Sequence, residues 1–392
     1  MLPHELLQIL SPKSKSLSLS LSCVISTTLR RTFINLQRAS GWRCVTALTI
    51  TRTVSIVHGV DFSRWGLAAV KSSLIVLILA LAAQPNGETF PEPKPISLTE
   101  GSFFVGREPY PMYVEYFTPA RRTHQTPIVL IHGGATSGAV YVSTPDGREG
   151  WAIYFVRHGW KVYVVDWPGH GRSPMPEEYP TMSLRRVVDA NLELLNKIGP
   201  AVVLTHSMSG VVGWKLAETV PKQVAAIVSI ATGPPVNMPK GSFPAISAIH
   251  NSFVPTGSGS YFPEDKPVRY KLGAAKQAYA STALFPLEAL DEFYATLVPE
   301  SPRALNEVFN KDGMGITVDP KKFAIVPQVL ITGDEDPRHS NVVDEGTARF
   351  VGAEHIYLAD VGMRGHGHMM MIEKDNQKIA QLIIDWLVKK GF

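Results

Sequence analysis

The sequence predicts an α/β fold in which helices cover both faces of a mostly parallel central sheet. Short, continuously apolar segments alternate with longer segments of helical periodicity from about residue 96 onward, as expected when strands are buried on both faces. Small, glycine-containing loops follow several of these apolar segments and mark strand ends. A long insertion interrupts the alternation before the last two expected strands.

Each expected strand is a short apolar segment bounded by turn-forming residues. Residues 96–117 predict two strands joined by a glycine-containing turn. Later strands are expected at the start of the segments 127–138, 160–174, 201–210, 225–235, 328–337 and 353–362. Helices, recognised by apolar residues at helical spacing, are expected at 183–199, 211–220 and 376–391.

The insertion covers about residues 234–326. It is first rich in proline and glycine and then contains helical segments at 271–280 and 287–297. An insertion of this length between two sheet strands predicts a helical cap over the carboxyl edge of the sheet, where open α/β sheets bind their ligands.

Charge and cysteine usage separate the N-terminal part from the remainder of the chain. The net charge of +4 is small and gives no reason to expect a nucleic-acid partner. Residues 1–60 hold seven basic residues against the single acid Glu5, so the remainder is slightly acidic. Both cysteines, Cys23 and Cys44, lie in this part, which predicts no disulfide and no cysteine metal site beyond residue 85.

Residues 1–84 are expected to form a leader that precedes a folded domain of residues 85–392. Lys71, the apolar run 74–83 and the small residues that end it are typical of a secretory signal peptide. The run of about ten residues is shorter than the roughly 20 that span a bilayer, so no stable membrane span is expected. We interpret roughly the first 65 residues as a misassigned start and expect a secreted protein.

Two other locations stay open. In one, residues 67–83 tether the protein to a membrane as a signal anchor. In the other, residues 1–63, which are rich in Ser, Thr and Arg and poor in acids, direct the protein to mitochondria. The oligomeric state is also open, and a homodimer is among the possibilities.

The segment VVLTHSMSGVVGW, residues 202–214, predicts a strand, a tight turn and a helix. A serine on such a turn is lifted off the sheet edge, and small residues must flank it two positions away because strand and helix approach closely. For Ser207 these residues are Thr205 and Ser209, although neither is the usual glycine; for Ser209, one of them is the branched Val211. Ser207 is therefore the favoured nucleophile, and a plain serine-rich turn is the alternative.

A serine hydroxyl needs a neighbouring base to take its proton. The segment RGHGHMMMIEK, residues 364–374, follows the last expected strand and contains His366 and His368. We favour His368, because its spacing to Glu373 fits a loop that leads into a helix. Three other histidines are expected to organise backbone or to pack beside the turn that holds Ser207: His132, His170 and His206.

The base in turn needs an acid that orients the imidazole and stabilises its charged form. The turn GDEDP after the strand 328–332 offers Asp334, Glu335 and Asp336. Asp336 is favoured because it stands three residues past Gly333. Asp334 is expected to cap the turn and Glu335 to face solvent. A charged turn without a catalytic role is the alternative.

An oxyanion that forms during attack on a carbonyl needs two backbone N–H donors. Met208, which follows the favoured nucleophile, is expected to supply one of them. Gly134, in the loop after the strand near residue 130, is expected to supply the other, because a glycine lets this loop approach the substrate oxygen closely. Ordinary turn glycines are the alternative.

The remaining charged motifs carry no separate chemistry. Asp166 and Arg172 in DWPGHGRS are expected to pair and to fix a loop beside the cleft. No zinc-ligand spacing and no phosphate-binding loop is present, and His366 and His368 without a third ligand are weak support for a metal site. Neither a cofactor nor a metal is therefore expected.

From about residue 96 to its end, the chain resembles an α/β-hydrolase, and more narrowly a group of secreted bacterial and fungal esterases related to a bacterial alkaline esterase. The motifs that carry the resemblance are IHGGATSG, TPDGREGWAIYF, VVDWPGHGRSP, LTHSMSG and GHGHMMMIEKDN. The resemblance implies the α/β-hydrolase fold and ester hydrolysis with Ser207 as nucleophile and His368 as base. The bacterial enzyme resembles a variant arrangement in which the acid is a glutamate just after the sixth strand. This chain has Ala231 and Thr232 at that place and no carboxylate. We therefore expect Asp336 to be the acid.

Three functions are weighed. The first is a serine hydrolase that cleaves small-molecule carboxylic esters, lactones or secondary-metabolite esters among them, through an acyl-enzyme. The second is an acyltransferase that uses the same triad. The third is a non-catalytic hydrolase-like binding protein, which the complete set of Ser207, Asp336 and His368 disfavours. An epoxide hydrolase or dehalogenase is disfavoured because those enzymes place aspartate at the elbow.

Overall fold

The computed structural model describes residues 17–26, 29–38, 43–51, 53–56, 95–239 and 262–392, and the chain divides into two compact units, residues 1–90 and 91–392. In the first unit, an antiparallel sheet consists of β1 Leu17–Ser26, β2 Leu29–Arg38, β3 Arg43–Thr51 and β4 Thr53–Ile56, in that order. The sequence analysis made no prediction for this sheet. The signal-like segment 71–83 lies outside the described residues.

The second unit is built on an eight-stranded sheet with the order β12–β11–β10–β9–β7–β8–β6–β5. β5 and β6 pair antiparallel, β6 pairs antiparallel with β8, and the remaining neighbours are parallel. The strands are β5 Leu98–Val105, β6 Met112–Pro119, β7 Ile128–Ile131, β8 Val162–Asp166, β9 Ala201–His206, β10 Val224–Ile230, β11 Gln328–Thr332 and β12 Glu354–Tyr357. This mostly parallel sheet confirms the predicted fold class.

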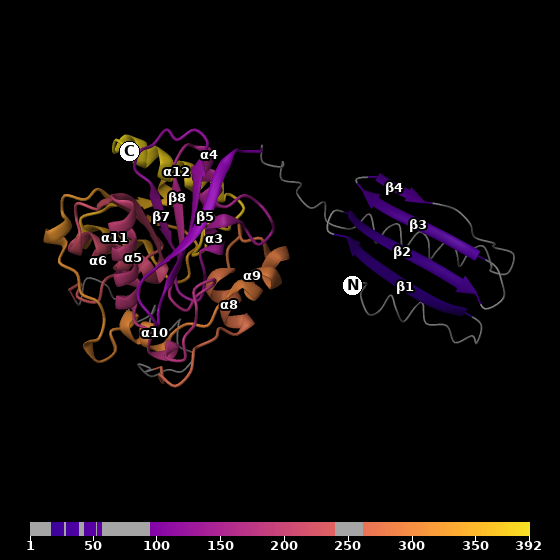
Figure 1. Cartoon of the computed structure of the whole chain (residues 1–392), viewed down its shortest axis with the longest axis horizontal. Helices are drawn as coiled ribbons and strands as arrows, with labels where there is room; N and C mark the ends of the chain where they lie inside the picture. Colours follow the sequence, from indigo (N-terminus) through magenta and orange to yellow (C-terminus); the bar gives the residue numbers. More distant parts are fainter. Residues whose placement is uncertain (1–16, 27–28, 39–42, 52, 57–94, 240–261) are drawn as a thin grey trace. The chain divides into compact units, whose positions relative to one another are not determined.

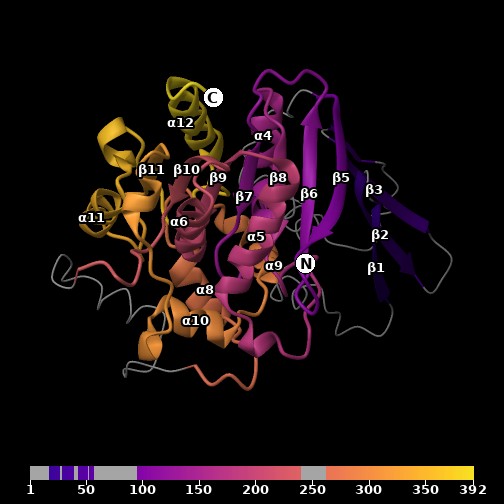
Figure 2. The same ribbon diagram turned by 60° about the vertical axis from the view of Figure 1, so that its left-hand side comes forward.

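Helices cover both faces of this sheet, and Figure 1 shows them on either side of the strands. In Figure 2, α5 and α6 lie side by side over one face. The helices are α3 Ala139–Val142, α4 Trp151–Arg157, α5 Leu184–Ile198, α6 Gly210–Thr219, α8 Leu272–Tyr279, α9 Leu290–Thr296, α10 Pro302–Val308, α11 Asn341–Val351 and α12 Asn376–Lys389. Among the described residues, none of the helices has the length and apolar character that crossing a membrane requires.

The two layers of core follow from the alternation of side chains along each strand. In β7, Ile128 and Leu130 join the hydrophobic cluster that includes α4 and α12 residues, whereas Val129 and Ile131 join the cluster of α5 and α6. All four side chains are fully buried. Each contributes about 1.5–3 kcal/mol of burial free energy, which explains why β7 is apolar throughout.

The segment between β10 and β11 holds the helices α8, α9 and α10, which Figures 1 and 2 both show at the same end of the sheet. Part of it, residues 240–261, lies outside the described residues. Its described part contacts loops that follow the strands: Tyr279 O–H donates to the carbonyl oxygen of Gly134 (3.4 Å), and the Val298 amide donates to that of Ala135 (3.0 Å). These contacts place the described part of the insertion beside the loop that follows β7, and the cap of residues 234–326 stays a prediction.

The structure differs from the sequence prediction in a few elements. Of the expected strand 353–362, only Glu354–Tyr357 pairs, and Leu358–Val361 is a 3₁₀-helix. Within the described residues, β12 is an edge strand that pairs only with β11, so little holds a longer strand in place. α4 and α11 were not predicted; α11 contains an internal glycine and several β-branched residues, which weaken the helical signal.

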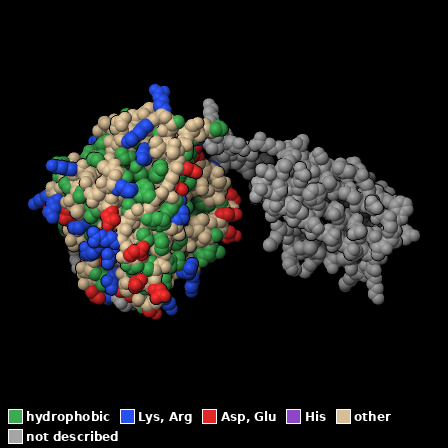
Figure 3. Space-filling view, in the orientation of Figure 1, with side chains coloured by type: hydrophobic (Ala, Val, Ile, Leu, Met, Phe, Trp, Pro, Cys, Tyr) green, Lys and Arg blue, Asp and Glu red, His purple; other side chains and the backbone are tan. Residues whose placement is uncertain are grey.

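Exposed charges on the second unit are mixed. Figure 3 shows acidic and basic side chains interspersed with hydrophobic ones over the face in view. Large hydrophobic side chains that are more than two-fifths exposed, such as Ile325 and Val342, are scattered among several elements. Scattered apolar side chains of this kind are ordinary for a folded surface.

Candidate active site

The turn after β9 lifts Ser207 off the sheet edge. β9 ends at His206, a 3₁₀-turn covers Ser207–Ser209, and α6 follows directly. Ser207 has a φ of 54°, the left-handed region that costs a non-glycine residue about 1–3 kcal/mol. A strained serine at a strand-to-helix turn is typical of a nucleophile elbow.

The small flanking residues have a steric reason. A Cβ atom added at Gly213 of α6 would come within 2.7 Å of the Thr205 methyl carbon, so β9 and α6 are already in close contact there. Ser209 is fully buried, and its Oγ accepts from the His206 amide (2.8 Å) and lies 2.9 Å from the Ile131 carbonyl oxygen. Ser209 thus ties the turn to the end of β7 and leaves Ser207 as the serine that faces the histidine loop.

Ser207, His368 and Asp336 form one continuous hydrogen-bonded series. Ser207 Oγ lies 2.9 Å from His368 Nε2, and His368 Nδ1 lies 2.9 Å from Asp336 Oδ2. The side chains of His368 and Asp336 are fully buried. The structure therefore brings together the three residues that the sequence analysis singled out, from loops after three different strands.

His366, the other histidine of this loop, has a different partner. Its Nδ1 lies 2.9 Å from Glu373 Oε2, and Glu373 Oε1 accepts from the Gly367 amide (2.8 Å) and from the Thr282 hydroxyl (2.9 Å). The backbone carbonyl of His368 lies 2.8 Å from His206 Nε2. These contacts hold the loop so that the His368 ring faces Ser207.

Burial and neighbouring charges set the protonation of the pair. Burial lowers the pKa of His368 to about 4, against the opposing effect of the Asp336 carboxylate. Burial disfavours the ionised form of Asp336, but the charge of His368 and its hydrogen bond hold the pKa of that carboxyl well below its usual range. At neutral pH the pair is therefore a neutral imidazole beside a carboxylate, the state in which His368 can accept a proton.

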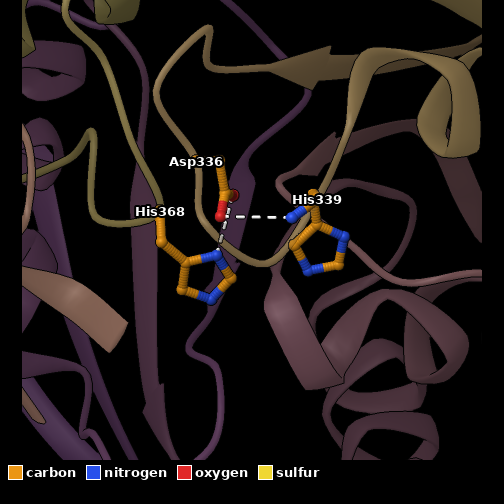
Figure 4. A group of neighbouring side chains, drawn as sticks. All are labelled: Asp336, His339 and His368. Carbon is orange, nitrogen blue, oxygen red and sulfur yellow. Dashed lines mark hydrogen bonds and ion pairs between the residues drawn. The ribbon is translucent and has the colours of Figure 1, made fainter. Parts of the chain in front are cut away.

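Asp336 and His368 also lie beside His339, and Figure 4 shows Asp336 between the two histidines. Ligand atoms of the three residues all lie within 4.8 Å of one another, so the group could hold a metal ion. Both His368 nitrogens, however, already face Ser207 and Asp336. A metal bound there would have to displace one of these contacts.

The contacts of Asp334 differ from the sequence prediction. Its Oδ1 does not cap its own turn but accepts from the amides of Gly365 (2.9 Å) and His366 (3.0 Å), across to the histidine loop. Glu335 is exposed, as expected, and its Oε2 accepts from the Ala283 amide (3.0 Å) of the cap. The turn after β11 thus holds both the histidine loop and the cap.

Gly134 and Met208, the predicted oxyanion donors, lie next to each other. A Cβ atom added at Gly134 would come within 2.1 Å of Met208 Sδ and 3.0 Å of Glu300 Oε2, so a larger residue there would have to displace the Met208 side chain. Among the described residues, neither amide donates a hydrogen bond to another protein group. Neither N–H group is therefore engaged within the described part of the chain, as the predicted role of oxyanion donor requires.

Comparison with known proteins adds to this geometry. A model of the alpha/beta hydrolase family matches residues 128–382, which is more than half of the chain. The chain belongs to the alpha/beta hydrolase family. The match begins at β7 and ends within α12, so it includes the elbow, the turn after β11 and the histidine loop.

Relatives of this hydrolase include a curated protein of almost the same extent. A probable secreted lipase, phiG, of a fungus (strain ATCC 74256) is 26% identical over 385 residues, covering 82% of this chain and 98% of that protein. Two solved structures resemble it in fold. A carboxylesterase of the thaumarchaeon Nitrososphaera gargenis is 17% identical with a TM-score of 0.50, covering 73% of this chain and 98% of its own. Polyneuridine aldehyde esterase is 16% identical with a TM-score of 0.51, covering 67% of this chain and 99% of its own.

Glu300 is a residue of the hydrolase site that sequence reasoning missed. It comes from the cap segment and is fully buried, and its Oε2 accepts from the Ala135 amide (2.8 Å) and lies 3.2 Å from His170 Nε2. Burial disfavours its charge, but His170 and the backbone donors keep the pKa of Glu300 below its usual value. A single glutamate in VPESP gives no sequence signal for this role.

His339 is the second residue that was missed. Its ring stacks on that of His368, with centroids 5.3 Å apart and planes 5° apart, and its Nδ1 lies 3.4 Å from Asp344 Oδ1. Burial disfavours the charged imidazole, but Asp344 raises the pKa of His339 above its usual value. His132 and His170 both contact backbone, as expected: His132 Nε2 accepts from the Trp167 amide (2.9 Å), and His170 Nδ1 lies 3.2 Å from the Pro168 carbonyl oxygen.

The expected pair of Asp166 and Arg172 is also present. Arg172 Nε donates to Asp166 Oδ2 (2.8 Å), while Asp166 Oδ1 accepts from the Gly138 amide (2.7 Å). The carboxylate therefore joins the loop after β8 to the loop after β7. Its role is to fix these loops, as predicted.

A pocket opens beside Ser207. Ser207, Met208 and His339 line it on the side of the hydrogen-bonded series. Most of its other walls are apolar and come from α5, α6, α10 and the segments after β10 and α10: Leu184, Val211, Val236, Val308, Phe309 and Ile316. Among the lining residues that the structure describes, Glu307 is the one acidic side chain.

Proposed function

We propose that this protein is a serine hydrolase that cleaves small-molecule carboxylic esters through an acyl-enzyme intermediate. The observation that carries the proposal is the continuous series from Ser207 Oγ through His368 to Asp336, with both contacts at 2.9 Å. Membership of the alpha/beta hydrolase family and the likeness to a protein named as a probable secreted lipase support it.

The first half of the reaction acylates Ser207. His368 Nε2 accepts the hydroxyl proton while Ser207 Oγ attacks the ester carbonyl carbon, and the carbonyl oxygen becomes an oxyanion. The amides of Met208 and Gly134 donate hydrogen bonds to that oxygen, a contribution of about 2.7–4 kcal/mol for one such donor. His368 then gives its proton to the leaving alkoxide as the carbon–oxygen bond breaks.

The second half releases the acid. A water molecule gives a proton to His368 and attacks the acyl carbon, and the Ser207 oxygen leaves and takes the proton back. Asp336 stays ionised throughout, since its role is to orient the imidazole and to stabilise its cationic form. The net reaction converts one ester and one water to one acid and one alcohol.

An acyltransferase would use the same acyl-enzyme, with an alcohol or amine in place of water. A non-catalytic binding protein would have no need of a strained serine with a φ of 54° in contact with a buried histidine. We propose hydrolysis because the curated relative named above is a probable secreted lipase. We also propose that the protein is secreted, on the basis of the signal-like segment 71–83 and the name of its fungal relative.

The test combines activity with covalent labelling. The unaltered protein should hydrolyse p-nitrophenyl esters, and an alkyl fluorophosphonate should inactivate it by forming an oxygen–phosphorus bond at Ser207 with loss of fluoride. Ser207→Ala should lose both, and the matched variant Ser209→Ala should retain most of both. Labelling at another residue, or hydrolysis that survives Ser207→Ala, would contradict the proposal. Product analysis with an added alcohol separates hydrolysis from acyl transfer.

A further inference from the structure

Among the described residues that line the pocket beside Ser207, one is acidic, and most of the walls away from Ser207 and His339 are apolar. Glu307 lies in α10, is 4% exposed, and shares the pocket with Val211, Val308 and Phe309. Burying an ionisable side chain among apolar walls costs free energy unless its polar atoms find hydrogen-bond partners. The atoms that still lack a partner therefore decide which ligands the pocket binds well.

One carboxylate oxygen of Glu307 is already used by the fold. Oε2 accepts from the Leu184 amide at 2.6 Å, in the first turn of α5. Ser183, at the N-cap position of that helix, makes no side-chain cap hydrogen bond, so Glu307 supplies the cap instead. Holding α5 explains the position of Glu307 but accounts for only one of its two oxygens.

The second oxygen, Oε1, has no hydrogen-bond partner within residues 95–239 and 262–392. Oε1 is also not one of the described side-chain atoms that are both fully buried and without a hydrogen-bond partner. It therefore keeps some accessible surface. The neighbouring guanidinium of Arg303 faces Glu264 instead. Burial raises the pKa of Glu307, with Arg185 and Arg303 opposing this effect from a distance. The carboxyl group is therefore held in position through Oε2, and Oε1 is left to accept a further hydrogen bond.

We propose that this pocket binds an apolar chain of the ester substrate that ends in a hydrogen-bond donor, with Glu307 as the acceptor that selects it. This inference rests on the proposed ester hydrolysis at Ser207. The donor is a hydroxyl or an ammonium group, and a chain that ends in a carboxylate is rejected.

The selectivity has a simple physical origin. A donor at the end of the chain gives Oε1 the hydrogen bond that it lacks and replaces the hydration that the donor loses. A carboxylate at the same place would lie beside another carboxylate in surroundings that screen charge poorly, and like charges placed together are a common way to exclude a ligand. A methyl end loses nothing in the apolar pocket but leaves Oε1 without a partner.

The experiment compares matched esters that differ only at the chain end. Two series of six-carbon chains, one on the acyl side as p-nitrophenyl esters and one on the alcohol side as acetate esters, carry a methyl, hydroxyl, ammonium or carboxylate end. The value of kcat/KM is measured for each ester with the full chain at about pH 8, well above the ordinary pKa of a glutamate carboxyl. The two series cover both ways in which an ester can enter the pocket.

We expect one series to show selectivity in the unaltered protein. The carboxylate-ended ester should have a kcat/KM about tenfold or more below that of the methyl-ended ester, and a donor-ended ester should equal or exceed the methyl-ended one. Glu307→Gln, which keeps an acceptor for the Leu184 amide, should bring the methyl-to-carboxylate ratio towards one. The matched variant Glu292→Gln changes an exposed residue of α9 and should leave the ratio as it is.

Equal kcat/KM values for all four ends in both series would overturn the inference, and so would a ratio that Glu307→Gln leaves unchanged. The ranking in the unaltered protein stands on its own should Glu307→Gln fail to fold. Failure of the proposed function would look different, because no ester would then be hydrolysed or hydrolysis would survive Ser207→Ala. The hydroxyl and ammonium esters together identify which donor is preferred.

Discussion

The carboxylate of Glu300 accepts a hydrogen bond from the backbone amide of Ala135 over 2.8 Å. The two residues are 165 positions apart, and Ala135 directly follows Gly134, one of the two proposed oxyanion donors. Ala135 has a φ of 55°, and its carbonyl accepts from the Val298 amide at 3.0 Å. The cap therefore holds a strained loop of the active site through both a side chain and the backbone.

Changing Glu300 should slow the chemical step more than it weakens substrate binding. Glu300→Ala removes the acceptor for the Ala135 amide and leaves His170 without its buried partner, so the Gly134 amide should shift from its place. We expect kcat to fall by about tenfold or more with a small change in KM, since misplacing a catalytic group by about 1 Å can cost a hundredfold. Glu300→Gln, which keeps an acceptor, should lose less.

Steady-state kinetics with a p-nitrophenyl ester measure this effect, and thermal unfolding shows how much of it is loss of fold. The exposed variant Glu292→Gln is the control. A higher KM with an unchanged kcat in Glu300→Ala would indicate that Glu300 serves substrate binding or the cap alone.

Asp336→Asn should keep the fold and lower kcat by roughly a few thousand-fold, because loss of the orienting charge has an effect of about 10⁴ in serine triads. Asp334→Asn should cost far less, since its remaining side-chain oxygen can still accept from the Gly365 and His366 amides. Near-normal kcat in Asp336→Asn together with a large loss in Asp334→Asn would move the acid to Asp334. Glutamate introduced at Ala231 in the Asp336→Asn background tests whether a carboxylate after β10 can take over.

The pH dependence of kcat/KM should reflect the buried histidine. The base is neutral His368, whose pKa burial lowers to about 4, so activity is present above that value and is lost as pH falls through it. We expect nearly full kcat/KM at about pH 6, where a histidine of ordinary pKa would already be largely protonated. The nearby imidazole of His339 also lowers the pKa of His368, so His339→Gln should move the acidic limb to higher pH.

A profile with its midpoint near the ordinary histidine pKa, unchanged in His339→Gln, would contradict this assignment. Circular dichroism at each pH separates loss of the base from loss of the fold.

The free energy of unfolding should decrease as pH falls below about 6.5, the ordinary histidine pKa. Burial lowers the pKa values of His132 and His368 to about 4 and places that of His206 well below its usual value. Between these values and about 6.5, the unfolded chain binds protons that the folded chain does not, so stability is lost. His339, whose pKa is raised by Asp344, acts in the opposite direction.

Urea unfolding at a series of pH values between about 4 and 8 measures this slope. Replacing His206 by Gln removes one of the buried imidazoles and should make the slope shallower. A free energy of unfolding that rises as the pH is lowered through this range would show that the buried histidines take up protons in the fold.

The sequence by itself determined the parts of this protein that depend on neighbours along the chain. Continuous apolar strands between helical segments predicted the sheet and its layers, because strand and helix periods are local. The steric need for small residues around a tight turn favoured Ser207 over Ser209, and spacing within loops favoured His368 and Asp336. The structure brings these three side chains together, and their catalytic roles remain predictions for the experiments above.

Only the tertiary structure decided which distant residues support that site. Glu300 reaches the loop of Ala135 from the cap, His339 stacks on His368, and Glu307 both caps α5 and lines the pocket. None of these stands in a motif, because a lone glutamate or histidine has no local period and most such residues face solvent. Glu300 and Glu307 contact segments more than a hundred residues away along the chain. The ring of His339 meets that of His368 because a turn places the two face to face. Such neighbours exist only once the chain has folded.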